Sequence, residues 1–330
     1  MISINNMNYK FDYQWPQCFL KNQTYSKKDS KKSSNKLIDI IEKFFLKKFK
    51  SPVIVFPSAR SCIGSILEFE NLSRNDEVFV NKWVSNCVFN SVGFYTNPTI
   101  NFINPKIVLA NNNWGLVQKI KLSPKKKGII VDDSCDSLIT DNKNLYPNNS
   151  KYEIFSLPKL IGSVAGGIVI CKNRKFYRFC KSRQKKNKKL GITQSYLKFR
   201  ETKKNYDYDF RYKEVTNSYL EYNAAKNIVK NLDNYEINTN IIKKRLNIIG
   251  KNFKVQKDLK RYGPVILFEL KNNRSKNKLK KLFMFRHKVI NYKKNLSKQY
   301  LLFPVHFKIT DKIFNYNLRN ILKFKNSFKI

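Results

Sequence analysis

The chain has 330 residues, of which 42% are hydrophobic and 14% aromatic, so it can bury one large core or two unequal ones and is not a wholly disordered protein. Its formal net charge of +43 would attract phosphates, nucleotides, nucleic acid or anionic lipid without distinguishing among them. Most of the basic residues are lysines in a sequence also rich in asparagine and isoleucine, which looks partly like drift in an AT-rich genome. The chain has only two histidines, so the sequence lacks the histidine cluster of a zinc hydrolase and offers few candidates for a Ser-His-Asp triad.

The six cysteines are scattered without a C-x-x-C pair, so we expect reduced thiols. The longest weakly polar run, residues 160–171, is too short to span a bilayer, and the polar N-terminus does not resemble a signal peptide. The sequence therefore predicts a soluble cytoplasmic protein with no membrane contact.

The first half of the chain alternates strand and helix patterns. A helix with an N-cap candidate at Ser33 is predicted over 37–49. After it we expect strands at 53–56, 77–80, 99–103 and 127–131, with helices at 60–69 and 84–95. This order argues for a parallel α/β sheet. Two further apolar segments, 152–156 and 167–171, are too close together for an intervening helix and suggest an antiparallel pair.

The second half is more basic, and residues 172–189 hold ten basic side chains and no acidic one in a stretch that begins as an amphipathic helix. Beyond it the patterns predict helices at 215–232, 237–249, 276–282 and 311–324, and strands at 264–270, 283–292 and 302–306. We therefore expect a large domain over 1–212 and a smaller α+β domain over 213–330.

Two neighbouring motifs contain the residues that predict the chemistry. An apolar run ends in a carboxylate pair, Gly128-Ile-Ile-Val-Asp-Asp-Ser134, and the next strand pattern ends in Ser156-Leu-Pro-Lys159, followed by Gly166-Gly167. An acid and an amine at the ends of neighbouring strands would converge on one heteroaromatic ligand, as an imine-forming site for pyridoxal 5'-phosphate (PLP) requires.

The order and spacing of several motifs resemble the nucleotide-sugar aminotransferases of the DegT/StrS type. The motifs are Phe56-Pro-Ser-Ala-Arg-Ser-Cys-Ile63, Asp76-Glu-Val-Phe-Val80, Trp83-Val-Ser-Asn86, Val131-Asp-Asp-Ser-Cys-Asp136, Phe155-Ser-Leu-Pro-Lys159, Asn223-Ala-Ala225 and Phe303-Pro-Val-His306. The resemblance implies fold type I of the PLP enzymes, an α/β fold with a mainly parallel seven-stranded sheet flanked by helices. It also implies a homodimer that transfers an amino group from glutamate to a keto-sugar nucleotide in surface polysaccharide or sugar biosynthesis.

Two residues are expected at the reacting centre. Lys159 is the candidate amine that bonds to PLP and shuttles protons, although in so lysine-rich a chain it could be a surface residue. Asp133 is the candidate partner of the pyridine nitrogen, because strand alternation places it on the face of Ile129 and Val131. Asp132 faces the other way and is expected to be a structural or surface acid.

The remaining candidates surround the cofactor. Ser58, Ala59 and Arg60 lie between a strand and a helix, where backbone amides and the helix dipole favour a phosphate, although many helices begin after serine without any ligand. The resemblance makes Ser156 a second phosphate contact; otherwise it is a turn residue before Pro158.

Two further positions are suggested by the resemblance alone. Trp83 matches the aromatic residue that stacks on the pyridine ring, although a buried core tryptophan is the commoner explanation. Asp136 falls where the family usually has Gln or His near the phenolic oxygen of the cofactor, and an acid there would repel a phenolate.

The sequence leaves three other hypotheses about function open. Relatives that dehydrate sugars have a histidine in place of the lysine, so Lys159 argues against that branch. A noncatalytic relative would fold and dimerise without bonding to PLP. A nucleic-acid-binding protein is suggested by the charge, but no motif of that class is present, and we expect no nucleic-acid partner.

Overall fold

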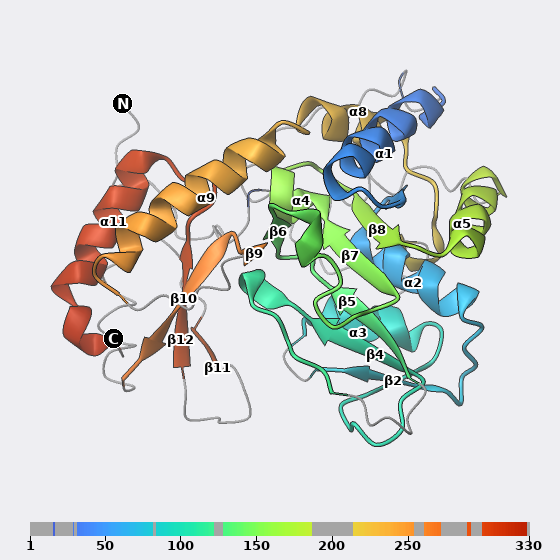
Figure 1. The fold of residues 1–330 in the computed structure, drawn as a ribbon, viewed down its shortest axis with the longest axis horizontal. Coiled ribbons are helices and arrows are strands. Elements are labelled where there is room, and N and C mark those ends of the chain that lie inside the picture. Colours follow the sequence, from blue (N-terminus) through green and yellow to red (C-terminus); the bar gives the residue numbers. More distant parts are fainter. Residues whose placement is uncertain are drawn as a thin grey trace.

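The computed structural model describes residues 16, 29, 32–81, 84–121, 128–186, 214–253, 261–271, 289–291 and 299–328. A seven-stranded sheet lies in the part of the molecule drawn in blue and green, and a three-stranded sheet lies in the orange and red part (Figure 1). Helix α9 (Asn234–Gly250) extends from one part to the other. Across the described segments, no helix combines the length and apolar character that crossing a bilayer requires.

The large sheet has the strand order β1-β8-β7-β5-β4-β2-β3. Its strands are β1 (Val53–Phe56), β2 (Glu77–Val80), β3 (Asn97–Thr99), β4 (Ile107–Asn111), β5 (Ile129–Asp133), β7 (Tyr152–Ser156) and β8 (Gly167–Cys171). The five strands from β3 to β7 run parallel, whereas β8 is antiparallel to both of its neighbours. The predicted mainly parallel sheet and the antiparallel pair at 152–156 and 167–171 are thus confirmed.

Apolar residues cover both faces of this sheet, as expected when helices pack on each side. On one face, Val53 and Val55 of β1 belong to a core with α1 (Asn35–Phe49), α4 (Leu157–Ile161), α8 (Tyr222–Lys230) and α9. On the other, Ile54 and Phe56 belong to a core with α2 (Ala59–Phe69), α3 (Asn86–Gly93) and α5 (Arg174–Lys186). The alternation of side chains along β1 therefore divides the core into two layers.

The two helices that precede and follow β1 form for reasons visible in the sequence. Ile38, Ile41, Phe45 and Phe49 recur at helical spacing along α1, and all four are buried. Helix α2 begins after Ser58, whose side chain accepts a hydrogen bond from the backbone N–H of Ser61 and so caps the first turn.

The second half of the chain contributes a three-stranded antiparallel sheet of the order β10-β12-β11. It comprises β10 (Val265–Leu270), β11 (Val289–Asn291) and β12 (Gln299–Pro304), followed by α11 (Asp311–Lys323). A short two-stranded sheet joins β6 (Leu138–Ile139) to β9 (Arg261–Tyr262) and so connects the two parts. Because one hydrophobic core contains residues of both parts, the division at residue 212 stays a prediction.

Three expectations about the large sheet were wrong. Strand β4 was not predicted, and the strand expected at 99–103 is instead β3, which ends at Thr99. A five-residue helix, α4, stands between β7 and β8, where no helix was expected. It fits because Pro158 occupies its first turn, where a missing N–H has no consequence, and Gly162 ends it in the left-handed conformation. The predicted helix at 276–282 lies outside the described residues.

Candidate active site

The carboxyl ends of the adjacent parallel strands β5 and β7 bring the predicted amine and acid to one place. Asp133 is the last residue of β5, and Ser156 is the last residue of β7. Lys159 follows within the first turn of α4 rather than at the strand end itself. Clefts at the carboxyl ends of parallel strands are the usual ligand sites of open α/β sheets. Lys159 is therefore carried by a short helix that directly follows β7.

Lys159 forms an ion pair with Asp136, and the distance between Nζ and Oδ1 is 2.6 Å. The Asp136 side chain is only 6% exposed and that of Lys159 is 29% exposed. Burial favours the neutral amine, but the negative charges of Asp136 and, further away, Asp133 outweigh it and raise the pKa of Lys159 above its ordinary value. In this structure the amine is therefore held as an ammonium.

Asp133 lies on the sheet face covered by α2, the face that also carries Val131. Its Oδ2 accepts a hydrogen bond of 2.9 Å from Asn111 Nδ2, and its Oδ1 accepts one of 3.2 Å from the backbone N–H of Cys135. Burial raises the pKa of the Asp133 carboxyl, while the hydrogen bonds from Cys135 and the charge of Lys159 act in the opposite direction. A further positive charge beside Asp133 would stabilise its ionised form and lower its pKa.

The N-terminus of α2 approaches the start of β8 very closely. A Cβ built on Gly167 would lie 2.4 Å from the carbonyl carbon of Ser58 and 2.5 Å from the backbone nitrogen of Ala59. The backbone N–H of Gly166 also donates a hydrogen bond of 2.7 Å to Pro57 O. Because Gly167 pairs with Ser156 across the sheet, the first turn of α2 lies next to the end of β7.

The other residues predicted to contact the cofactor are Arg60, Ser156 and Trp83. The guanidinium of Arg60 forms a two-pronged ion pair with Glu214, so its side chain is engaged by another part of the chain. Ser156 is largely buried at the end of β7. Trp83 lies outside the described residues.

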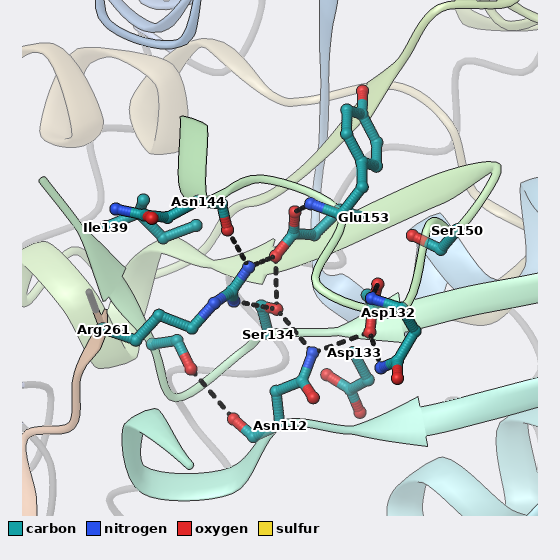
Figure 2. A network of polar contacts seen from close by, with 12 residues as sticks. Asn112, Asp132, Asp133, Ser134, Ile139, Asn144, Ser150, Glu153 and Arg261 are labelled. Atoms are coloured by element: carbon teal, nitrogen blue, oxygen red, sulfur yellow. Dashed lines mark hydrogen bonds and ion pairs between the residues drawn. The ribbon is translucent and has the colours of Figure 1, made fainter. Parts of the chain in front are cut away.

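Asp132 is fully buried, not a surface acid, and belongs to a polar network (Figure 2). Its Oδ1 accepts hydrogen bonds of 2.9 Å from Asn112 Nδ2 and 2.7 Å from Asn148 Nδ2. Asn112 Nδ2 also donates to Ser134 Oγ at 3.1 Å. The two acids of the pair therefore act on opposite faces of β5, Asp133 toward α2 and Asp132 into this network.

The same network contains a buried ion pair between Arg261 of β9 and Glu153 of β7, with 2.8 Å between Nη2 and Oε1. Arg261 also donates to Ser134 Oγ at 2.8 Å and to the carbonyl of Asn144 at 2.5 Å. Ser134 in turn donates to Glu153 Oε1 at 2.6 Å. The turn that follows β5 is thus anchored to a strand more than a hundred residues later in the sequence.

Sequence reasoning missed several of these partners. Asn111 directly follows an apolar run, and a polar residue at such a place is a signal that could have marked it as a neighbour of Asp133. Arg261 and Glu214 carry no comparable signal, because a charged residue far along the chain does not reveal its partner.

Comparisons with known proteins identify a family and a fold for this chain. A family model described as "Putative PLP-dependent aminotransferase" matches residues 40–326. No curated protein gives a significant match. Among solved structures, Helicobacter pylori PseC, an aminotransferase involved in the biosynthesis of pseudoaminic acid, is 14% identical with a TM-score of 0.66. The match covers 96% of this chain and 100% of that one.

Two further structures share the fold. A DegT DnrJ EryC1 StrS aminotransferase from Brucella abortus is 12% identical with a TM-score of 0.61, over 88% of this chain and 90% of that one. The 8-amino-7-oxononanoate synthase of Francisella tularensis is 17% identical with a TM-score of 0.54, over 91% and 90%. The expected fold type I is confirmed, and so is the resemblance on which it was based. Since the family model spans most of the sequence, the chain belongs to this family of PLP-dependent aminotransferases.

Proposed function

We propose that the protein, as a homodimer, transfers an amino group from glutamate to a keto-sugar nucleotide in surface polysaccharide or other sugar biosynthesis. The observation that supports the proposal is that Lys159 and Asp133 lie at the carboxyl ends of the adjacent strands β7 and β5, near the first turn of α2, where their charges interact. A sugar as the substrate is supported by the fold that this chain shares with PseC and with a "Putative sugar aminotransferase" from Streptococcus pneumoniae.

The described residues around the first turn of α2 would hold the phosphate of PLP. The first turn of α2, with Ser58 and Ala59, presents backbone amides that have no partner within a helix, and Ser156 lies close by; both suit a phosphate. Gly167 permits this arrangement, because a side chain there would push the helix away from the strand. Arg60 would contribute its backbone, since its guanidinium is paired with Glu214.

Two side chains would act on the ring and on the substrate. Asp133, a buried carboxylate, would hold the pyridine nitrogen in its protonated form. Lys159 would bind the cofactor covalently and afterwards carry protons to and from the substrate carbon. When bound, PLP supplies the electron-accepting ring that stabilises the carbanion left when the substrate loses a proton. We propose that Trp83 stacks on that ring.

The proposal is tested by incubating the protein with PLP, reducing with borohydride and locating the modified lysine by mass spectrometry. We expect modification at Lys159 and its loss in Lys159→Ala, whereas Lys36→Ala, at an exposed position of α1, should leave capture at Lys159 unchanged. Capture that is spread over surface lysines, or that persists at its full level in Lys159→Ala, would refute the site. A panel of keto-sugar nucleotides assayed with glutamate then identifies the substrate.

The ion pair of Arg60 with Glu214 and that of Lys159 with Asp136 favour one alternative, a noncatalytic relative. Such a protein would fold and dimerise but show no covalent capture. The nucleic-acid alternative is less favoured, because Lys181 and Arg183 of the basic helix α5 pair with Glu42 and Glu68 of the same chain.

A further inference from the structure

The ion pair between Lys159 and Asp136 has a location that an ordinary surface pair does not have. It joins the first turn of α4 to the turn after β5, and the Asp136 side chain is nearly inaccessible to solvent. Pairs exposed to water contribute little, since solvent screens them, but a carboxylate held this far from water interacts strongly with a neighbouring ammonium.

The position of Asp136 is fixed by its neighbours in the sequence. Ser137 Oγ donates a hydrogen bond of 2.9 Å to Asn112 O, and Ser134 Oγ belongs to the network around Arg261. The backbone N–H of Ser137 also donates to Ser134 O at 3.0 Å. Because Ser134 and Ser137, on either side of Cys135 and Asp136, are anchored in the interior, the Asp136 carboxylate is held next to Lys159.

Among the described residues, Asp136, Asp133 and the thiol of Cys135 interact electrostatically with the amine of Lys159, and Lys308 lies beside Gly162 at the end of the same short helix. Burial raises the pKa of the Cys135 thiol well above its ordinary value, so this group is neutral. Asp133 already accepts hydrogen bonds from Asn111 and from the backbone of Cys135. Asp136 is in direct ionic contact with the amine, at 2.6 Å.

We propose that Asp136 is the positioning residue that keeps Lys159 protonated and sets the pH at which this amine becomes a nucleophile. The proposal rests on the function proposed above. To react, the Lys159 ammonium releases one proton, to the Asp136 carboxylate or to water. Its nitrogen lone pair then bonds to the aldehyde carbon of PLP, and the two remaining amine protons leave with the carbonyl oxygen as water. No electron is gained or lost overall, and no further reactant is needed.

The test measures the reactivity of Lys159 without any cofactor. The protein is treated with a trace of acetic anhydride between pH 7 and pH 11, and the acetylated fraction of each lysine is measured by mass spectrometry. Since an anion in contact shifts the pKa of a neighbouring base by about 1–3 units, Asp136→Asn should make Lys159 at least about tenfold more reactive at pH 8. Asp136→Glu, which keeps the charge, should stay close to wild type.

Two controls keep the outcome decisive. Asp39→Asn, an exposed carboxylate on α1, should leave the profile of Lys159 unchanged. In the wild-type protein itself, Lys159 should become reactive only at a higher pH than the exposed Lys36, a comparison that does not depend on any variant folding. A wild-type Lys159 that reacts alongside Lys36, or an Asp136→Asn profile identical to wild type, would overturn the proposal.

Adding PLP and borohydride separates this proposal from the proposed function. Capture at Lys159 whose optimum moves to lower pH in Asp136→Asn supports both. Capture at Lys159 with the same pH dependence in both proteins would overturn the role of Asp136 alone. If Lys159 is not captured at any pH but its acetylation shifts as expected, the role of Asp136 is supported and the cofactor site is refuted.

Discussion

Replacing Arg261 by methionine should destabilise the protein strongly, although this residue lies far in sequence from the strands that it supports. The guanidinium is 1% exposed and its partner Glu153 is fully buried. Methionine removes the cation together with its hydrogen bonds to Ser134 and Asn144 and leaves the Glu153 carboxylate without its countercharge. Breaking a buried pair in this way costs about 3–5 kcal/mol, a large share of the roughly 5–15 kcal/mol that stabilises a typical protein.

The measurement is the free energy of unfolding in urea, followed by circular dichroism for wild type, Arg261→Met, Glu153→Gln and the double variant. Because each single change leaves a partner unsatisfied and the double change removes both charges, the double variant should lose about 0.5–3 kcal/mol less than the sum of the two single losses. The exposed Arg319 on α11 provides a matched control, since Arg319→Met should change stability by less than about 0.5 kcal/mol.

The loss in Arg261→Met should also depend on pH. Burial raises the pKa of Glu153, and the charge of Arg261 opposes that rise, so removing Arg261 raises the pKa further. A carboxyl whose pKa is raised in the folded state stabilises the protein at low pH and loses that contribution as the pH rises. The deficit should therefore be smaller at pH 5 than at pH 8. A deficit below about 1 kcal/mol at pH 8, or one that shrinks as the pH rises, would refute this account of the network.

Three further changes follow from individual contacts. Tyr235→Phe deletes a fully buried hydroxyl that donates to Ile139 O and accepts from Ile139 N, so thermal and urea denaturation should show a loss of about 1–3 kcal/mol. Gly167→Ala would press a methyl group against Ser58 and should cost about 1–3 kcal/mol and weaken PLP binding measured by equilibrium dialysis. Asp133→Asn cannot hold a pyridinium cation by charge, so transamination should fall at least about a hundredfold, an extent measured by comparing kcat.

Each of these has an outcome that contradicts it. A Tyr235→Phe protein as stable as wild type would mean that the backbone N–H and C=O of Ile139 do not depend on the tyrosine hydroxyl. Unchanged PLP affinity in Gly167→Ala would separate the first turn of α2 from the phosphate, and full activity in Asp133→Asn would remove the acid from the site.

Local sequence patterns predicted much of the scaffold. The strand at Val53–Phe56 and the helix that follows Ser58 were both identified, because a short run of β-branched and aromatic residues and a capping serine are signals contained in a few neighbouring residues. Strand β4 was missed although, like β1, it consists only of buried residues, because an apolar run this short does not by itself identify a strand. Helix α4 escaped because five residues are too few to show helical periodicity, and its formation depends on the strands at either end.

The sequence by itself determined which chemical groups are present and in what order: an acid pair closing one strand, a lysine after the next, and a serine before a helix. Only the tertiary structure decided their partners. It placed Asp136 against Lys159, Glu214 against Arg60, and Arg261 against Glu153 and Ser134. The physical reason is that capping and alternation are local interactions, whereas these ion pairs join residues brought together by the packing of the whole chain, and charge alone does not specify its partner.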